Sequence, residues 1–219
     1  PDTLFIGMDQ EPICIAYAAQ KICEQELPNA LVLPRGAASL PRLFAAGELD
    51  AITINFPTPQ PKAKYAKKRL VHVDHLMLYR PLFAGGATVT LRTDSKPLHD
   101  YALGQFAAAG YGTLWVSDDV RRDHPEHPET EYECRTREMG AIVYGICATP
   151  ATQPTDEQLE VGRAQEQSLA CYLPDDLDEL TYVPLGMEEA VENFKNRARK
   201  GKKRLPQESQ GPLMVAASA

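Results

Sequence analysis

The sequence predicts an α/β protein with a mostly parallel sheet and helices on both of its faces. Short apolar runs alternate along the chain with segments whose apolar residues recur at helical spacing, and the links between them are short. This alternation is typical of βαβ units, in which helices cross over between parallel strands. A hydrophobic share of 43% and a charged share of 24% over 219 residues are those of a globular chain that can form a full core.

The predicted elements are separated by Gly, Pro and Asp. Residues 3–9 form a short apolar run that ends in Gly-Met-Asp, which predicts a buried strand entering a loop. Pro12 suits the first turn of the helix that follows. We predict further strands at 29–36, 49–56, 87–94 and 111–117, and a last, antiparallel strand at the end of 133–150. We predict the intervening helices at 11–27, 39–49, 71–86 and 95–110.

The character of the chain changes at Ala151. The segment that follows is polar and bounded by prolines, with helical patterns near 156–172 and 186–205. We therefore divide the chain into a domain of residues 1–150 and a partly helical C-terminal extension of residues 151–219. Seven basic residues lie between Lys195 and Arg204. Such a run can bind RNA, but a solvated helix end that favours cations is the preferred interpretation.

The composition limits the function classes. A formal net charge of −7 and a pI near 5.3 argue against a protein that coats nucleic acid or membrane over its whole surface, while a local basic site is compatible with them. No apolar run approaches the roughly 18 residues of a membrane span, and we expect no signal peptide. The five cysteines show no CxxC spacing, which favours reduced thiols, a cytoplasmic location and no metal site.

Candidate ligand-binding residues follow the strands, because ligands of open parallel sheets bind beyond the carboxyl ends of the strands. The positions to consider are Asp9, residues 35–37, residues 55–60 and residues 93–94. A carboxylate at a strand end, such as Asp9, can accept hydrogen bonds from both hydroxyls of a ribose. A strand-end Asp is also a common helix cap, so this signal alone is weak.

The most unusual segment is NFPTPQPKAKYAKKRL, residues 55–70, which leaves the third strand and turns through three prolines. Residues 62–69, here called the basic arm, then place five basic residues within eight positions. They are Lys62, Lys64, Lys67, Lys68 and Arg69. Taken alone, the basic arm is most simply the solvated start of a helix.

This segment resembles the strand-end motif of the bacterial tRNA (guanine-N7-)-methyltransferase family, in which Phe-Pro-Asp-Pro-Trp and a basic stretch follow a strand. FIGMD, GGATVTLRTD and TEYECRTREMGAIVYGI resemble further motifs of that family, in the same order and with similar spacing. The similarity covers residues 3–148, and residues 151–219 have no counterpart. The resemblance implies a Rossmann-like, class I methyltransferase fold with S-adenosylmethionine as cofactor and tRNA as partner.

The resemblance also implies roles for individual residues. Asp9 would hold the cofactor ribose, Ala37 stands at a second cofactor position whose acid is lost, and Thr58 stands where the family has its proposed catalytic aspartate. The positions that contact substrate in the family are occupied here by Lys62, Asp94, Thr130, Glu131, Tyr132 and Glu133. The residues expected to hold RNA phosphates are Lys64, Lys67, Lys68 and Arg69.

The departures from the family pattern keep three functions open. The first strand with its Gly-rich loop is absent from this chain, and since the chain starts at Pro1 we expect that strand upstream. Thr58 and Gln60 replace the aspartate and the tryptophan of the motif. The leading hypothesis is methyl transfer to guanine N7 of tRNA. The alternatives are a divergent methyltransferase acting on a small molecule and a non-catalytic RNA-binding or partner protein. No membrane partner is expected, and the oligomeric state is not predicted.

Overall fold

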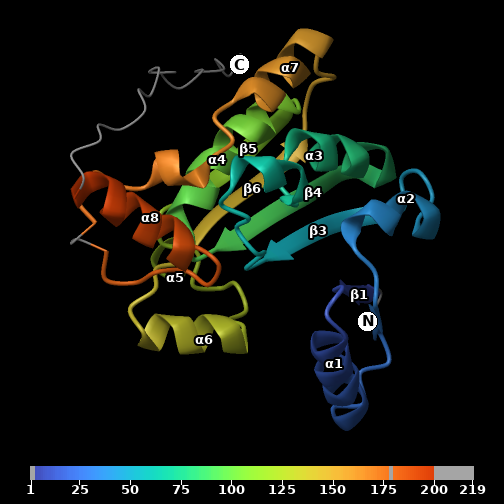
Figure 1. The fold of residues 1–219 in the computed structure, drawn as a ribbon. Helices are drawn as coiled ribbons and strands as arrows, with labels where there is room; N and C mark the ends of the chain where they lie inside the picture. The colour runs from blue at the N-terminus through green and yellow to red at the C-terminus, as the bar shows by residue number, and fades with distance from the viewer. Residues whose placement is uncertain (1–2, 178–179, 200–219) are drawn as a thin grey trace.

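A computed structural model describes residues 3–177 and 180–199, in which strands and helices alternate (Figure 1). The strands are β1 (Phe5–Met8), β2 (Ala30–Leu33), β3 (Leu49–Asn55), β4 (Phe83–Thr93), β5 (Tyr111–Ser117) and β6 (Tyr144–Pro150). The α-helices are α1 (Pro12–Glu24), α2 (Leu40–Leu43), α3 (Val73–Tyr79), α4 (Lys96–Ala108), α5 (Val120–Asp123), α6 (Glu131–Glu138), α7 (Asp156–Ala164) and α8 (Glu188–Arg199). Four 3-10 helices are η1 (Ala37–Ser39), η2 (Ala63–Lys68), η3 (Arg80–Leu82) and η4 (Leu169–Tyr172).

The strands form two groups. β1 and β2 pair in parallel, and the other four follow the order β3-β4-β6-β5. β3 and β4 are parallel, whereas β6 is antiparallel to both β4 and β5, which confirms the predicted direction of the last strand. Asn55 pairs with Arg92, so β3 and β4 end side by side and the residues that follow them meet at one edge of the sheet.

The helix predicted over 39–49 ends at Leu43, and the boundary predicted at residue 86 is also wrong. The helix expected over 71–86 ends as an α-helix at Tyr79, continues through one 3-10 turn, and gives way to β4 at Phe83. Pro81 cannot donate the hydrogen bond that a continuing helix needs. Phe83 pairs with Leu49 of β3, so the following glycines lie in the strand instead of ending a helix. Helix α6 was not predicted as a separate element.

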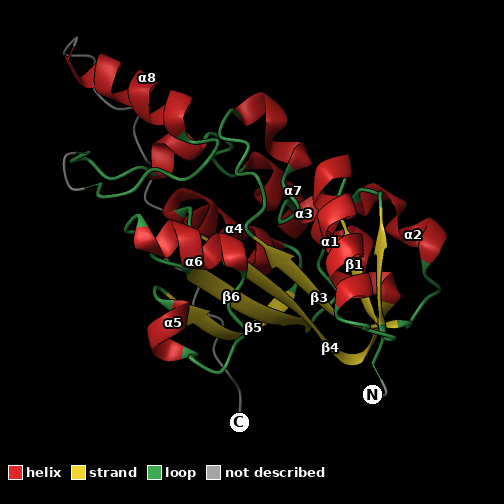
Figure 2. Cartoon of the chain, turned by 90° about the horizontal axis from the view of Figure 1, so that it is seen from below, coloured by secondary structure: helices red, strands yellow, loops and turns green. Residues whose placement is uncertain are grey.

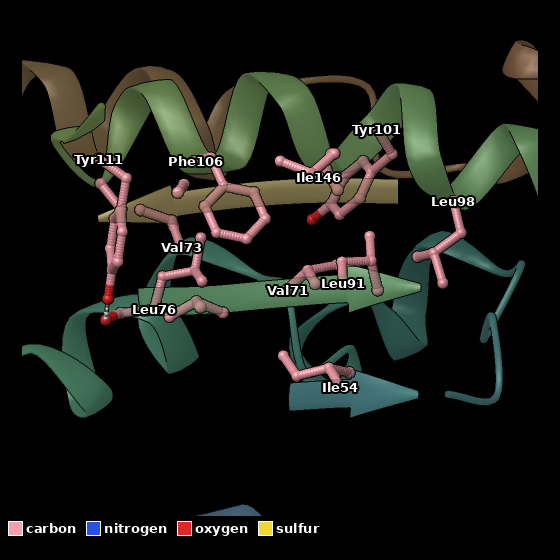
Figure 3. Packing of buried hydrophobic residues seen from close by; sticks show 14 of the residues in the cluster. Ile54, Val71, Val73, Leu76, Leu91, Leu98, Tyr101, Phe106, Tyr111 and Ile146 are labelled. Atoms are coloured by element: carbon pink, nitrogen blue, oxygen red, sulfur yellow. Dashed lines mark hydrogen bonds between the residues drawn. The ribbon is translucent and has the colours of Figure 1, made fainter. Parts of the chain in front are cut away.

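Helices α3, α4 and α7 lie on one face of the four-stranded sheet, and α6 lies on the other (Figures 1 and 2). The buried side chains between α4 and the sheet include Leu98, Tyr101, Phe106, Leu91 and Ile146 (Figure 3). On the opposite face, Arg92 of β4 reaches α6, while Leu114 and Val116 of β5 are exposed. The α/β arrangement with helices on both faces is therefore confirmed.

The C-terminal extension shares this core. Five apolar side chains of the extension are buried in the same cluster as the domain. They are Leu169, Leu173, Leu177, Met187 and Val191. At roughly 1.5–3 kcal/mol for each buried side chain, their burial stabilises the docked extension by an upper bound on the order of 10 kcal/mol. Lys200, Lys202, Lys203 and Arg204 of the predicted basic run lie outside the described residues.

Within residues 3–177 and 180–199, no helix has both the length and the apolar character that crossing a bilayer requires.

Candidate functional site

The turn after β3, residues 55–60, has a strained backbone. Phe56 and Gln60 have φ angles of 47° and 53°, which residues other than Gly rarely adopt. The turn stays tied to the sheet, because the Phe56 N–H donates to the carbonyl of Arg92 at 2.7 Å. Thr58 is exposed between the two strained residues. Such strain is often held at functional sites by the surrounding structure, which makes this turn a candidate site on geometric grounds.

Arg69 is the residue that holds this turn. Its guanidinium donates from Nη2 to the carbonyls of Gln60 and Gln167, both at 2.7 Å, and from Nε toward the carbonyls of Pro59 and Gln60. It lies over the ring of Tyr101 at 4.4 Å and is 1% exposed. Burial lowers the pKa of this guanidinium. The expectation that Arg69 binds an RNA phosphate is wrong, because its donors face the interior and link the turn to the extension.

The remaining cations of the basic arm face solvent. Lys64, Lys67 and Lys68 are exposed, and the Nζ atoms of Lys64 and Lys68 lie 4.9 and 4.8 Å from the centre of the Tyr65 ring. Their contact with RNA phosphates stays a prediction. Lys62 forms an ion pair with Glu189 of α8, in which Nζ and Oε1 are 2.8 Å apart. This pairing raises the pKa of Lys62 and lowers that of Glu189.

Asp94, just beyond the end of β4, is 7% exposed and accepts two tyrosine hydroxyls at the same oxygen. Tyr132 Oη donates to Asp94 Oδ2 at 3.0 Å and Tyr182 Oη at 2.7 Å. Burial, and next the Asp94 carboxylate, raise the pKa of both phenols, so both remain neutral donors. The ring of Tyr132 also packs against Phe56 at 5.0 Å, which brings the ends of β3 and β4 and the start of α6 together.

The other predicted positions around α6 have structural roles. Thr130 caps the helix, since its Oγ1 accepts from the Glu133 N–H at 3.1 Å. Glu133 is fully buried and forms ion pairs with Arg92 and with Arg121, the latter at 2.7 Å. The expectation that Glu133 contacts substrate is wrong in this arrangement, because two guanidinium groups occupy its carboxylate. Glu131 is exposed and forms an ion pair with Lys21 of α1.

The predicted cofactor positions follow β1 and β2. Asp9 is exposed, and its Oδ1 accepts from the Glu11 N–H at 2.9 Å. This bond closes an Asx turn just before α1, whose N-cap is Glu11, and the exposed carboxylate stays accessible to a ribose. Ala37 begins η1 and packs against the core, so its methyl group offers no polar contact.

A potential set of metal ligands lies between α5 and α6, although the sequence predicted no metal site. The ligand atoms of His124, Glu126 and His127 all lie within 4.8 Å of one another. His124 Nδ1 already lies 3.3 Å from Glu126 Oε1, and its ring stacks on Trp115 at 4.2 Å. These three residues belong to a segment that the resemblance does not place in the site.

Sequence reasoning missed the contribution of the extension to this site. Tyr182 reaches Asp94 from 88 positions away, and Glu189 reaches Lys62 from 127 positions away. Neither residue belongs to a recognisable motif, so only the way in which the extension packs reveals them. A Cβ atom on Gly186 would lie 3.6 Å from both Pro59 and Thr58, which places the same segment over the turn.

Comparison with known proteins shows similarity over the domain. Residues 1–146 match the model of a family described as "Putative methyltransferase". The chain is 31% identical over 150 residues to a tRNA (guanine-N(7)-)-methyltransferase of Streptococcus equi subsp. zooepidemicus, covering 68% of this chain and 71% of that relative. It is also 31% identical over 147 residues to the protein of that name from Streptococcus pyogenes serotype M5, covering 67% and 70%.

Solved structures share the fold. An antibiotic-related methyltransferase has a TM-score of 0.51 at 17% identity, and the 16S rRNA methyltransferase KamB has a TM-score of 0.51 at 14% identity. Each alignment covers 68% of this chain and 77% of the other.

Proposed function

Because the chain belongs to the tRNA (guanine-N7-)-methyltransferase family, we propose that it transfers methyl from S-adenosylmethionine to N7 of a guanine in tRNA. The fold is the Rossmann-like class I methyltransferase fold, and the cofactor of that class is S-adenosylmethionine. A cytoplasmic location, where tRNA is available, is part of the proposal.

The observation that carries the proposal is that the turn with Thr58 and the residue Asp94 follow β3 and β4, whose ends lie side by side. The register of β3 against β4 brings the two strand ends together, and Tyr132 of α6 donates to Asp94 there. This edge is where ligands of such sheets bind. The proposed catalytic position, Thr58, and the substrate position Asp94 therefore follow two strand ends that lie side by side.

The chemistry needs positioning more than acid–base groups. Guanine N7 has a lone pair and no proton, so no general base is required at that atom. The cofactor supplies a methyl group activated by a positively charged sulfur. The protein has to hold the base in line with that methyl group, and orientation of this kind can provide much of the rate enhancement. Thr58 offers a neutral hydroxyl where the family aspartate offers a charged acceptor, which predicts weaker binding of the base.

Other residues around the strand ends bind the cofactor, the base and the RNA backbone in this proposal. In this proposal Asp9 accepts the ribose hydroxyls of the cofactor, and Asp94 accepts N–H groups of the base. Lys64, Lys67 and Lys68 add a cationic surface beside the turn, and such a surface holds an RNA backbone without reading its sequence.

The test is methyl incorporation from labelled S-adenosylmethionine into bulk tRNA by the full-length protein. The modified base is then identified by strand scission with borohydride and aniline, which cleaves RNA at N7-methylguanine. Incorporation followed by scission at a single guanine supports the proposal. Demonstrated cofactor binding without incorporation into any tRNA would contradict it.

A methyltransferase with a smaller substrate is the second candidate. The observation that favours it is the position of Gly186 over Thr58 and Pro59, which leaves less room for a large substrate to reach the turn. Methylation of free guanine nucleotides or other small acceptors, with tRNA inert under the same conditions, would distinguish this candidate from the first.

A further inference from the structure

We propose that residues 182–189 of the extension form a wall of the substrate site and that Tyr182 is a positioning residue for Asp94. The inference rests on the proposed function, because Asp94 is assigned to the substrate there. It goes beyond that function, because the matched family segment ends at residue 146 and so excludes the extension.

The same short segment touches each of the three candidate substrate groups. Tyr182 donates to Asp94 Oδ2 at 2.7 Å, Glu189 pairs with Lys62 at 2.8 Å, and Gly186 lies beside Thr58. Figure 1 shows α8 on the side of the molecule toward which β3 and β4 point. Contacts with all three groups by residues within eight positions place this segment at the site itself.

The wall is anchored and is not a loosely held flap. Met187 is fully buried and Val191 is 5% exposed, directly beside the contact residues. An earlier part of the extension holds the turn itself, because the Leu169 N–H donates to the carbonyl of Pro61 at 3.0 Å and Arg69 donates to the carbonyl of Gln167. The Lys62–Glu189 pair is exposed, so a phosphate can take the place of Glu189 on Lys62 while the buried anchors stay intact.

Tyr182 orients the Asp94 carboxylate for hydrogen bonds with a base. Two hydroxyls donate to the same oxygen, Oδ2, one from the domain and one from the extension. This fixes the plane of the carboxylate, whose other oxygen can accept from N1–H or from the N2 amino group of guanine. Removal of one hydroxyl frees the carboxylate to rotate, which should reduce selectivity for the guanine edge as well as rate.

The experiment compares Tyr182→Phe with the wild-type full-length protein on two tRNA substrates. One carries the natural target guanosine, and the other carries inosine there, which lacks only the N2 amino group. The wild type should prefer guanosine. Tyr182→Phe should lower kcat/KM for guanosine by about tenfold to a hundredfold, the effect of one charge-assisted hydrogen bond. The ratio of kcat/KM for the guanosine tRNA to kcat/KM for the inosine tRNA should fall toward one. Tyr132→Phe should lower this ratio as well.

Tyr172→Phe is the matched control. Its hydroxyl also lies in the extension but contacts Gln165 and the carbonyl of Glu166. The control should keep the wild-type ratio. An unchanged ratio in Tyr182→Phe, with or without a loss of rate, would overturn the positioning role, as would a wild type that methylates both tRNAs equally. A wild type that methylates no tRNA would overturn the proposed function and this inference with it.

Discussion

Arg69→Ala should destabilise the fold by about 3–6 kcal/mol without changing the salt dependence of tRNA binding. The guanidinium makes two hydrogen bonds of 2.7 Å, to the carbonyls of Gln60 and Gln167, and each bond from a charged donor contributes about 1.5–3 kcal/mol. The two contacts from Nε, to the carbonyls of Pro59 and Gln60, are longer at 3.2 Å and are not counted in this free energy. This decrease in the free energy of unfolding is larger than that of an ordinary surface substitution, which usually changes it by less than about 0.5 kcal/mol.

Lys68 provides the control, because it precedes Arg69 directly and faces solvent. Lys68→Ala should leave the stability unchanged within about 0.5 kcal/mol and should reduce the slope of log affinity against log salt by about 1. Urea unfolding with an unchanged m-value gives the stability of each variant, and filter binding to tRNA over a salt series gives the slope.

A contrary result is easily recognised. If Arg69→Ala were as stable as the wild type and lost about one unit of salt slope, then Arg69 would contact phosphate after all. The assignment of Arg69 to the interior would then be wrong.

Three further predictions concern buried groups and the altered motif. Glu133→Gln should destabilise the protein by about 3–5 kcal/mol in urea unfolding, because it leaves buried guanidinium groups uncompensated; a loss below about 1 kcal/mol would contradict the burial. Thr58→Asp should raise tRNA methylation by about tenfold to a hundredfold, since it restores a charged acceptor; a fall would favour the smaller substrate. Burial lowers the pKa of His72 below 6.5, so the unfolded chain takes up its proton first as the pH falls. The free energy of unfolding should therefore decrease below that pH, and His72→Asn, which keeps a helix cap, should lessen this slope.

The elements could be predicted from the sequence because local patterns determine them. Apolar runs bounded by Gly, Pro and Asp correspond to the strands, and the alternation with helices gives the α/β class. The error at residues 71–86 arose where a local signal was overridden by pairing with a distant strand. The glycines indicated a helix end, but pairing of Phe83 with Leu49 extends the strand back through them, and pairing between distant strands is not visible in a single segment.

The sequence could predict where along the chain the candidate site residues lie, but only some of their roles. Thr58 and Asp94 follow the ends of β3 and β4, as the strand-end rule expects, and their roles stay predictions. Glu133 shows the limit, because a buried ion pair with Arg92 depends on β4 and α6 meeting across the sheet. The spacing of charged residues in the sequence does not reveal such a partner.

Neighbouring cations of the basic arm differ in burial. Residues 63–68 adopt a 3-10 helix, and Arg69 follows it in an extended conformation. Ala66 and Arg69 share the buried side, and Lys67 and Lys68 share the exposed one. The Arg69 guanidinium ties the strained turn to the extension through the carbonyl of Gln167, while the exposed lysines are available to RNA.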